Sequence, residues 1–282
     1  MSTVSLAPTQ SAGFGRIREA TQDAFTVVWR NLVGLARTPQ LLVFSTIQPV
    51  IFVLMFVYVF GGAIGTNVSL PGVGELPYKD FLMPGIFAQT VVFGSVGTAI
   101  GLATDMQSGL LERFRSLPMA RSAVLVGRTG ADLLRNVFVV ILMAAVGFAV
   151  RAHYHTSLLE YLAGMGLLLL FGYAFSWIFA SVGLAVRNPE SAQAVAFPVM
   201  APLVFASSAF VPVTSMPGWL QAWAHNQPVS VTISAIRALQ VGPESIPGGD
   251  STAVLVLKAL AWCVGILVVF APLAVRRYRK AV

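Results

Sequence analysis

Long stretches of the chain contain apolar residues and no charge at all. No Asp, Glu, Lys or Arg occurs from Leu41 to Gly74, or again from Phe81 to Thr104. Runs of this length can cross a hydrocarbon core of roughly 30 Å as helices. The hydrophobic pattern therefore predicts an all-α integral membrane protein with six transmembrane helices, at about 41–61, 81–104, 123–150, 158–186, 191–211 and 252–275.

The segment before the first predicted span has a helical period. Residues 16–40 carry apolar side chains at steps of three and four positions, with Trp29 suited to the headgroup level. This pattern is typical of an amphipathic helix in the membrane interface, and a soluble cap helix is the alternative. We expect a disordered cytoplasmic tail at 1–15 and a basic cytoplasmic tail at 276–282, on either side of a transmembrane domain over 41–275.

Charged residues are few and unevenly placed. They make up 10% of the chain, whereas a soluble domain carries about 25%. Thirteen basic residues fall on the side of the two termini, and four, Lys79, Arg151, Arg237 and Lys258, fall on the other side. The positive-inside bias then places both termini in the cytoplasm. The net charge of +7 follows from this placement and does not indicate a nucleic-acid partner.

Two outer loops differ in composition. Residues 62–80 contain prolines and several glycines, which predict an irregular loop. Residues 212–250 contain five prolines, yet keep the apolar side chains Trp219 and Trp223. We expect short helices that enter the outer leaflet without crossing it, because irregular backbone at that depth must lie against protein or a watery cavity.

Motifs for catalysis and metal binding are missing from the sequence. No lysine follows a glycine, so the chain has no Walker A phosphate loop and does not hydrolyse ATP by that route. His153, His155 and His225 fall in loops and are interpreted as ordinary histidines, since a metal site needs more ligands in a defined geometry. We expect neither an enzyme active site nor a metal site.

The third predicted span carries a cluster of charges. Asp132 stands four residues after Arg128 and three before Arg135, so the three share a helix face and can neutralise one another. A structural ion cluster is the favoured interpretation, with a gating role as the alternative. An ion-coupled pump needs carboxylates within the membrane. The acidic residues near the spans all lie close to predicted ends: Asp105, Asp132, Glu160 and Glu190.

The second and fifth spans contain small, aromatic and proline residues. Gly94, Gly97 and Gly101 allow close helix packing, within the subunit or across a dimer seam. Prolines in the fifth span are expected to bend it. Five side chains are candidates for lining an amphiphile pathway, with plain packing as the alternative: Phe87, Gln89, Phe93, Met200 and Phe205.

The inner loop from Asp105 to Arg121 predicts a short amphipathic helix. Leu110, Phe114 and Leu117 form an apolar stripe, Glu112 and Arg113 lie on the remaining surface, and Pro118 ends the helix. Such a helix can lie on the lipid surface or insert into a groove of a soluble partner. The pattern alone leaves both possibilities open.

Five stretches of sequence carry a family resemblance. They are SGLLERFRSLP at 108–118, FVYVFGG at 56–62, YKDFLMPG at 78–85, RNPE at 187–190 and FVPVTSMPGWL at 210–220. Taken in their order along the chain, they resemble the ABC-2 type export permeases, especially the daunorubicin-resistance-like drug exporters. The resemblance implies six spans, an amphipathic entry helix, a coupling helix at about 105–117 and re-entrant outer helices before the last span. It also implies a dimer of permeases and a separate ATPase subunit that binds ATP and Mg²⁺.

From this resemblance we expect the membrane subunit of a bacterial ABC exporter for a drug- or antibiotic-like amphiphile, in the cell membrane. Export of a lipid or glycan is the alternative within the family, and an ion-coupled secondary transporter is the alternative from another class. Whether the two permeases are identical stays open. The residues expected to couple to the ATPase are Leu110, Glu112, Arg113, Phe114, Leu117, Arg187 and Glu190. Those expected to form an outer gate are Phe210, Pro212, Trp219 and Trp223.

Overall fold

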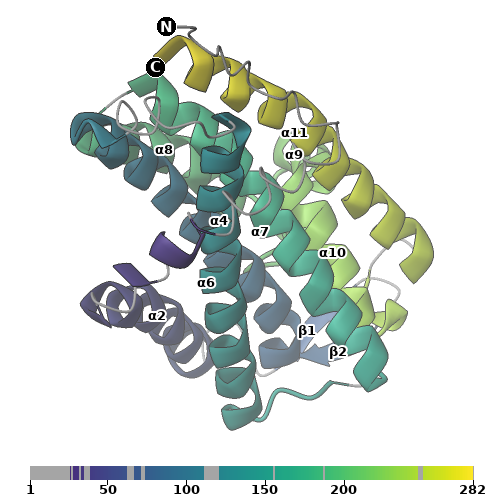
Figure 1. Ribbon diagram of the computed structural model, residues 1–282. Helices are drawn as coiled ribbons and strands as arrows, with labels where there is room; N and C mark the ends of the chain where they lie inside the picture. Colours follow the sequence, from purple (N-terminus) through teal and green to yellow (C-terminus); the bar gives the residue numbers. More distant parts are fainter. Residues whose placement is uncertain are drawn as a thin grey trace, which may run out of the picture.

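Every predicted apolar span overlaps a helix of the structure, at least over its first part (Figure 1). The computed structural model describes residues 26, 28–31, 33–34, 39–61, 67–70, 74–110, 121–154, 156–186, 188–246 and 250–281. The long helices are α2 Pro39–Leu54, which continues as the π-helix η1 Met55–Phe60, α4 Tyr78–Gln107, α6 Arg121–Ala149, α7 Leu158–Val186, α8 Pro189–Phe205 and α11 Thr252–Ala281. Residues 1–15 and much of the expected helix at 16–40 lie outside the described part of the chain.

Four of these helices are long and apolar enough to cross a membrane: α4, α6, α7 and α11. The other two predicted spans are shorter. α8 has 17 residues, or about 25 Å of helix, and the apolar stretch of α2 and η1 runs from Thr46 to Val59. The protein is therefore a multi-pass membrane protein, with four candidate spans in the described part of the chain, and six crossings remain a prediction.

The helices α4 and α7 pack closely at the centre of the molecule. Gly183 of α7 faces the backbone of α4, and a Cβ atom placed there would lie 2.8 Å from the Cα atom of Ala99. The Ser95 hydroxyl of α4 donates to the Gly172 carbonyl of α7 at 3.1 Å. α7 is apolar on all sides, as expected for a helix surrounded by protein, and buries Phe171, Phe175 and other aromatic rings.

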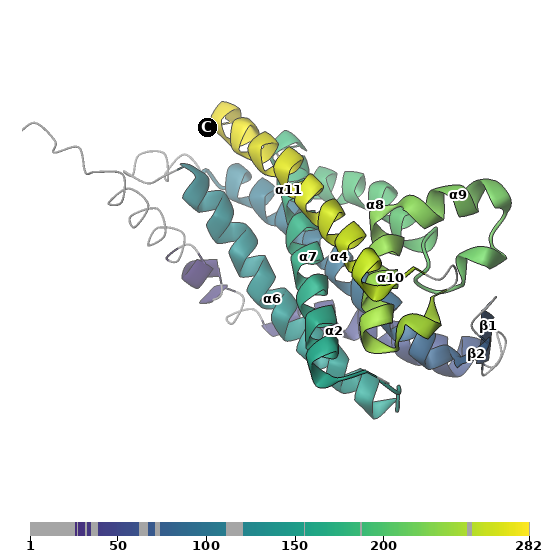
Figure 2. The same cartoon turned by 90° about the vertical axis from the view of Figure 1, so that its right-hand side faces the viewer.

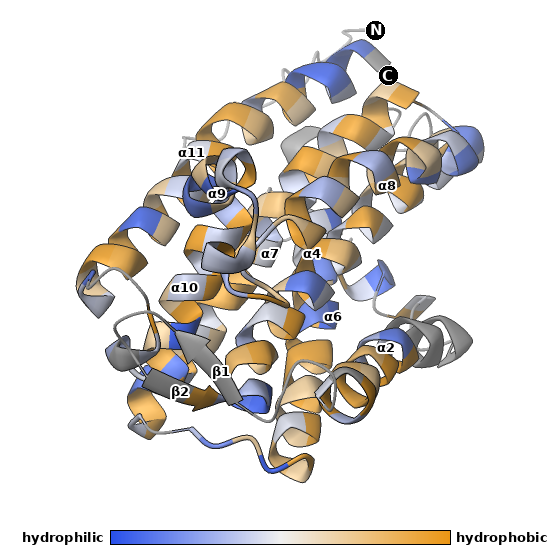
Figure 3. Ribbon diagram, turned by 180° about the vertical axis from the view of Figure 1, so that it is seen from behind, coloured by the Kyte–Doolittle hydropathy of each residue, from blue (hydrophilic) through white to orange (hydrophobic). Residues whose placement is uncertain are grey.

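The outer helices expose apolar side chains instead. Phe138 and Ile141 of α6 and Leu257 and Val268 of α11 are all more than half exposed. Figure 3 shows apolar residues along most of α11 and polar residues at its C-terminal end. Contiguous exposed apolar surface is rare on soluble monomers and suits contact with lipid or another subunit.

The two ends of the helix bundle differ (Figure 2). At one end, Arg277 near the end of α11 donates to the Ser181 carbonyl of α7 at 2.7 Å. Tyr278 is buried there with Leu102 and Val124, which lie near the end of α4 and the start of α6. The opposite end holds a hairpin and two short helices: β1 Asn67–Leu70, β2 Gly74–Pro77, α9 Gly218–Asn226 and α10 Pro228–Gln240.

The hairpin corrects the expectation of an irregular loop at 62–80. β1 and β2 pair antiparallel, with Leu70 opposite Gly74 and Asn67 opposite Pro77. Pro77, one of the prolines that suggested irregular backbone, is compatible with this arrangement because it stands at the end of its strand. α4 then begins directly at Tyr78 rather than at residue 81.

The segment after α8 also differs from its prediction. The fifth span is expected to reach residue 211, but α8 ends at Phe205 and residues 206–211 form turns and bends. Pro198 and Pro202 lie inside α8 and remove two backbone donors from its second half. Two short helices, α9 and α10, are found in 212–250, and α10 packs against α4, α7 and α11. Their insertion into the outer leaflet stays a prediction.

Candidate functional site

A cavity of about 350 Å³ lies between α2, α4, α6 and α8. Most of its wall is apolar and aromatic, as in most small-molecule sites. The apolar and aromatic lining residues include Phe52, Phe93, Ile100, Val139, Phe197 and Met200. The polar ones are Gln48, Gln89, Thr90, Arg135, Asn136 and Gln193. A cavity of this composition can hold an amphiphile, with one polar end and an apolar body.

The structure brings together three of the five residues predicted to line a pathway. Gln89, Phe93 and Met200 form part of the cavity wall. Phe87 is instead fully buried in the core. Phe205 is about half exposed and stacks on Phe210, with ring centroids 5.6 Å apart. Their part in transport stays a prediction.

An aromatic cluster stands beside the cavity. Phe210, from the turn after α8, stacks on Phe56 at 4.6 Å between ring centroids. It also lies 6.5 Å from the ring of Phe52, which lines the cavity. The Tyr78 hydroxyl donates to the Phe210 carbonyl at 3.2 Å and holds this turn against the start of α4.

The other residues of the expected outer gate lie apart from this cluster. Pro212 precedes a 3₁₀ turn at Val213–Ser215. Trp219 and Trp223 lie on α9, where their side chains are 77% and 41% exposed. Only Phe210 of the four therefore contacts the aromatic residues beside the cavity in the described structure.

Arg237, which is expected in an outer loop, is a buried cation. It belongs to α10, and its side chain is enclosed by protein. Its Nε and Nη2 atoms donate to the Phe81 carbonyl at 3.2 and 3.1 Å, and Nη2 also donates to the Ser208 carbonyl at 2.8 Å. The guanidinium carbon lies 3.9 Å from the centroid of the Phe81 ring, a cation–π contact. Arg237 thus joins α10 to α4 and to the turn after α8.

The positive charge of Arg237 is buried without a negative partner close by in the described part of the chain. No carboxylate forms an ion pair with it among the described residues. Burial lowers its pKa to about 9, which leaves the guanidinium charged at neutral pH. Backbone carbonyls and one aromatic ring therefore replace its hydration. Nothing in the period of the sequence distinguishes this arginine from a loop cation.

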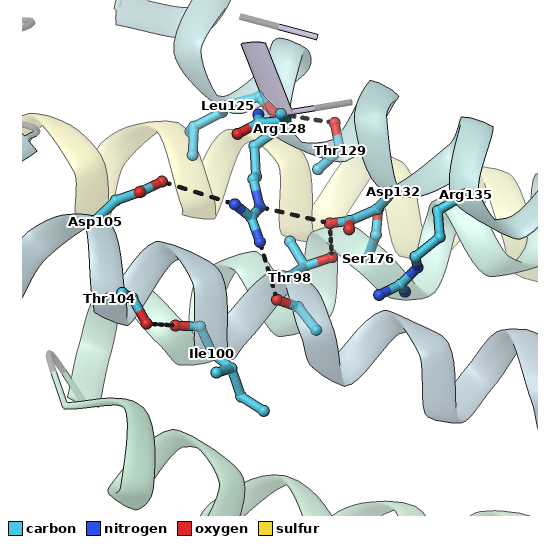
Figure 4. A network of polar contacts seen from close by, with 12 residues as sticks. Thr98, Ile100, Thr104, Asp105, Leu125, Arg128, Thr129, Asp132, Arg135 and Ser176 are labelled. Atoms are coloured by element: carbon cyan, nitrogen blue, oxygen red, sulfur yellow. Dashed lines mark hydrogen bonds and ion pairs between the residues drawn. The ribbon is translucent and has the colours of Figure 1, made fainter. Parts of the chain in front are cut away.

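The predicted ion cluster is present in part (Figure 4). Nε of Arg128 lies 3.8 Å from Oδ2 of Asp132, and its Nη1 lies 3.9 Å from Oδ2 of Asp105. Thr98 of α4 donates to Oδ2 of Asp132 at 2.6 Å. Nη2 of Arg30 lies 4.0 Å from Oδ2 of Asp105. The cluster therefore connects the segment before α2 with the end of α4 and the start of α6.

Arg135 does not join this cluster, contrary to the expectation from its spacing. Figure 4 shows its guanidinium set apart from Asp132. Its Nη2 atom donates to the Gly94 carbonyl of α4. A Cβ atom on Gly97 would lie 2.8 Å from Nη1 of Arg135, and one on Gly101 would lie 2.8 Å from Nη1 of Arg128. The glycines expected to allow helix packing thus leave room for two arginine side chains.

Most residues expected to couple to an ATPase lie outside the described part of the chain. These are Glu112, Arg113, Phe114, Leu117 and Arg187. Leu110 is described, directly after Gly109, whose φ of +69° ends α4. Glu190 is exposed in the first turn of α8, where the Asn188 side chain accepts from its backbone N–H at 2.9 Å and caps the helix.

Of the three histidines expected in loops, His153 lies in the loop after α6, whereas His225 belongs to α9 and His155 lies outside the described residues. The backbone N–H of His153 donates to Oδ1 of Asp80 at 2.8 Å, and its exposed ring lies 3.8 Å from Oδ2 of the same carboxylate. Beside it, burial and the nearby Tyr161 and Asp80 raise the pKa of the Tyr154 hydroxyl. Among the described residues, no group of three or more His, Cys, Asp or Glu side chains could hold a metal ion.

The chain is similar in sequence to known transport permeases. The chain is 34% identical over 261 residues to a daunorubicin resistance ABC transporter permease of Streptomyces coeruleorubidus, covering 93% of this chain and 87% of that protein. It is 27% identical over 281 residues to a probable doxorubicin resistance ABC transporter permease of Mycobacterium tuberculosis, covering 99% and 96%. An inner membrane transport permease of Escherichia coli is 24% identical over 222 residues, covering 77% and 84%. The family model described as the ABC-2 type transporter matches residues 22–241, and the chain therefore belongs to the ABC-2 type transporter family.

Proposed function

We propose that this chain is the permease subunit of a bacterial ABC exporter that moves an amphiphilic substrate out of the cell. The observation that carries the proposal is the cavity between α2, α4, α6 and α8, whose wall combines aromatic and aliphatic side chains with a few polar groups. Relatives named as daunorubicin and doxorubicin resistance permeases favour a drug-like amphiphile. Export of a lipid or glycan is the alternative cargo.

The energy comes from ATP, bound with Mg²⁺ on a separate ATPase subunit. The inner loop after Gly109 is the contact with that subunit, and a second permease completes the pathway. Leu110 and Glu190 support this arrangement, because they follow the ends of α4 and α7, and both of these ends contact the end of α11 through Tyr278 and Arg277. The side where α11 ends is cytoplasmic in the proposal, and α2–η1 and α8 complete six crossings.

The aromatic cluster around Phe210 closes the cavity towards the outside in this proposal. Phe52 belongs to both the cavity wall and the cluster, so a substrate leaving the cavity meets stacked rings before the turn after α8. Trp219 and Trp223 on α9 lie further out and contact lipid.

An ion-coupled secondary transporter fits the charges less well. Such a transporter needs a carboxylate that can exchange a coupling ion. Asp132 accepts a hydrogen bond from Thr98 and lies beside Arg128, while Asp105 lies between Arg128 and Arg30. These neighbours hold both carboxylates in ion pairs.

Transport in proteoliposomes separates the two mechanisms. The tagged chain is purified from its native membrane with any ATPase that accompanies it, and is reconstituted. Probes are doxorubicin and a fluorescent fatty acid. We expect ATP-dependent movement of at least one probe that survives a protonophore. Movement that needs an ion gradient and ignores ATP would overturn the proposal.

A further inference from the structure

Arg135 places a positive charge on the wall of the cavity, midway along α6. It stands 14 residues after the first residue of α6, or about 21 Å along the helix. Ionisable side chains at such depth are rare in transmembrane helices, and they mark substrate or ion pathways when they face a cavity. Arg135 faces one, because both it and its neighbours Gly94 and Gly97 line the cavity.

The charge of Arg135 has no carboxylate counterpart in the described part of the chain. The two nearest acidic residues of the cluster, Asp105 and Asp132, contact Arg30 and Arg128. No Asp or Glu lines the cavity. The Gly94 carbonyl accepts one N–H of Arg135 but carries no net charge. The cavity is therefore electropositive at this point.

A second polar group in the cavity wall lacks a partner. Gln89 is 5% exposed, and its Oε1 atom has no hydrogen-bond partner among the described residues. Buried polar atoms are usually satisfied, and an exception calls for an explanation such as a missing ligand. Gln89 stands five residues before Gly94 on α4, about 8 Å along the helix, and lines the same cavity. It can accept a hydrogen bond from a hydroxyl or amide of a ligand.

We propose that Arg135 forms an anion subsite in this cavity, so that the cargo is an amphiphile with a carboxylate or phosphate group and an apolar body. This inference rests on the proposed export function and specifies its substrate class. The guanidinium binds the acid, Gln89 binds a neutral polar group beside it, and Phe52, Phe93 and Met200 contact the apolar body. A cationic amphiphile is disfavoured, since its charge would lie near Arg135 in a medium of low dielectric constant, without a carboxylate to offset the repulsion. Doxorubicin, whose amino sugar is protonated at neutral pH, belongs to this disfavoured class, so the anionic fatty acid is the transport probe that this inference expects to move.

Equilibrium binding to the purified complex in a neutral detergent tests the subsite without requiring transport. The probes are radiolabelled dodecyl phosphate and dodecyltrimethylammonium, which share a chain length and differ in charge. We expect dodecyl phosphate to bind about tenfold more tightly or better, as for a charge-assisted hydrogen bond. Equal affinities for the two probes would overturn the subsite.

Variants test whether Arg135 causes the preference for dodecyl phosphate over dodecyltrimethylammonium. Arg135→Gln should weaken dodecyl phosphate binding by about tenfold or more and leave dodecyltrimethylammonium binding unchanged or stronger. Arg135→Lys should restore most of the affinity for dodecyl phosphate. Arg151→Gln, an exposed arginine just after the same helix, should bind like the unaltered protein. Unchanged phosphate binding in Arg135→Gln protein that keeps its elution profile would contradict the proposal.

A further arm distinguishes cargo from a resident lipid headgroup. Proteoliposomes of phosphatidylcholine alone, or with phosphatidylglycerol, are assayed for ATP-dependent movement of dodecyl phosphate. We expect movement in both and its loss in Arg135→Gln. If Arg135→Gln loses bound phosphatidylglycerol but moves dodecyl phosphate normally, the site holds lipid and the proposal fails. If the unaltered complex binds dodecyl phosphate more tightly than dodecyltrimethylammonium but does not transport dodecyl phosphate with ATP, the export function fails and the anion site stands.

Discussion

Two arginines of this chain lie inside the protein, with different surroundings. Arg237 is enclosed and donates to the carbonyls of Phe81 and Ser208. Arg135 lies at the edge of a cavity and donates to the Gly94 carbonyl. Arg237 makes three hydrogen bonds and joins α10 to α4 and to the turn after α8, whereas Arg135 keeps donors available to a ligand. We therefore assign Arg237 to stability and Arg135 to substrate binding.

Replacing Arg237 by methionine tests the stabilising role. Arg237→Met keeps an unbranched side chain but removes every donor, which leaves the Phe81 and Ser208 carbonyls buried without this partner. We expect the free energy of unfolding to fall by about 3 kcal/mol, as for other buried polar groups that lose their partners. Unfolding in detergent, followed by tryptophan fluorescence, measures the change.

The control for this variant is Arg151→Met, which alters an exposed arginine. It should change stability by less than about 0.5 kcal/mol. If the two variants unfold alike, the hydrogen bonds of Arg237 contribute little, and α10 must be held by its apolar contacts alone.

Local spacing predicts part of the candidate site. Arg128 and Asp132 are four residues apart on one helix, and their ion pair is found. Arg135 stands three residues after Asp132, which also permits contact along one helix, but its partner Gly94 lies 41 residues away on α4. Periodicity along one helix carries no information about a neighbouring helix. The same limit explains why Phe87 lies in the core while Gln89, two residues later, lines the cavity.

At the scale of elements, apolar length predicts helices well and helix ends less well. The predicted span 158–186 matches α7 Leu158–Val186, because the run after Glu160 has no charge and Ser157 caps the start of the helix. α8 ends six residues before its predicted limit, where the apolar run continues through a turn. The strands β1 and β2 have only four residues each, which is too short to show a clear alternation of apolar and polar residues.

The contact between α4 and α7 predicts a matched pair of glycine variants on α7. A methyl group on Gly183 would meet the backbone of Ala99, whereas one on Gly166 would meet nothing within 4 Å. We expect Gly183→Ala to lower the free energy of unfolding by about 1–3 kcal/mol, because two helix backbones must separate. Gly166→Ala should be neutral or stabilise by up to about 1 kcal/mol, since alanine favours helix.

Thermal unfolding of both variants in the same detergent provides the comparison. Equal midpoints would show that α4 can shift relative to α7 without cost. That result would also weaken the view that these two helices form a rigid centre around which the cavity is built.

At the scale of the whole molecule, the inner loop should transmit force from the ATPase. Phe114 is the central residue of the predicted apolar stripe. Phe114→Asp should cost about 2 kcal/mol or more of docking free energy, as for an aromatic hot spot, and the buried carboxylate adds to this. We expect roughly a thirtyfold loss of ATPase association at equal membrane expression. Phe114→Leu should retain most of it. Normal ATPase recovery and export by Phe114→Asp would exclude this helix from coupling.

The number of crossings depends on α8, whose 17 residues fall slightly short of a full hydrocarbon core. Its two ends lie at opposite ends of the bundle: Pro189 follows α7 closely, whereas the turn after Phe205 contacts the start of α4 through Tyr78 and Arg237. We therefore predict that residues 191 and 214 lie on opposite sides of the membrane.

Cys263 is buried and is the single cysteine of the chain, so Cys263→Ala provides a background for labelling. Ser191→Cys and Thr214→Cys then place one thiol at an exposed position at each end. An impermeant maleimide should label Thr214→Cys on intact cells and Ser191→Cys only in inside-out vesicles. Labelling of both from the same side would mean that α8 turns back within the membrane, and the six-span topology would have to be given up.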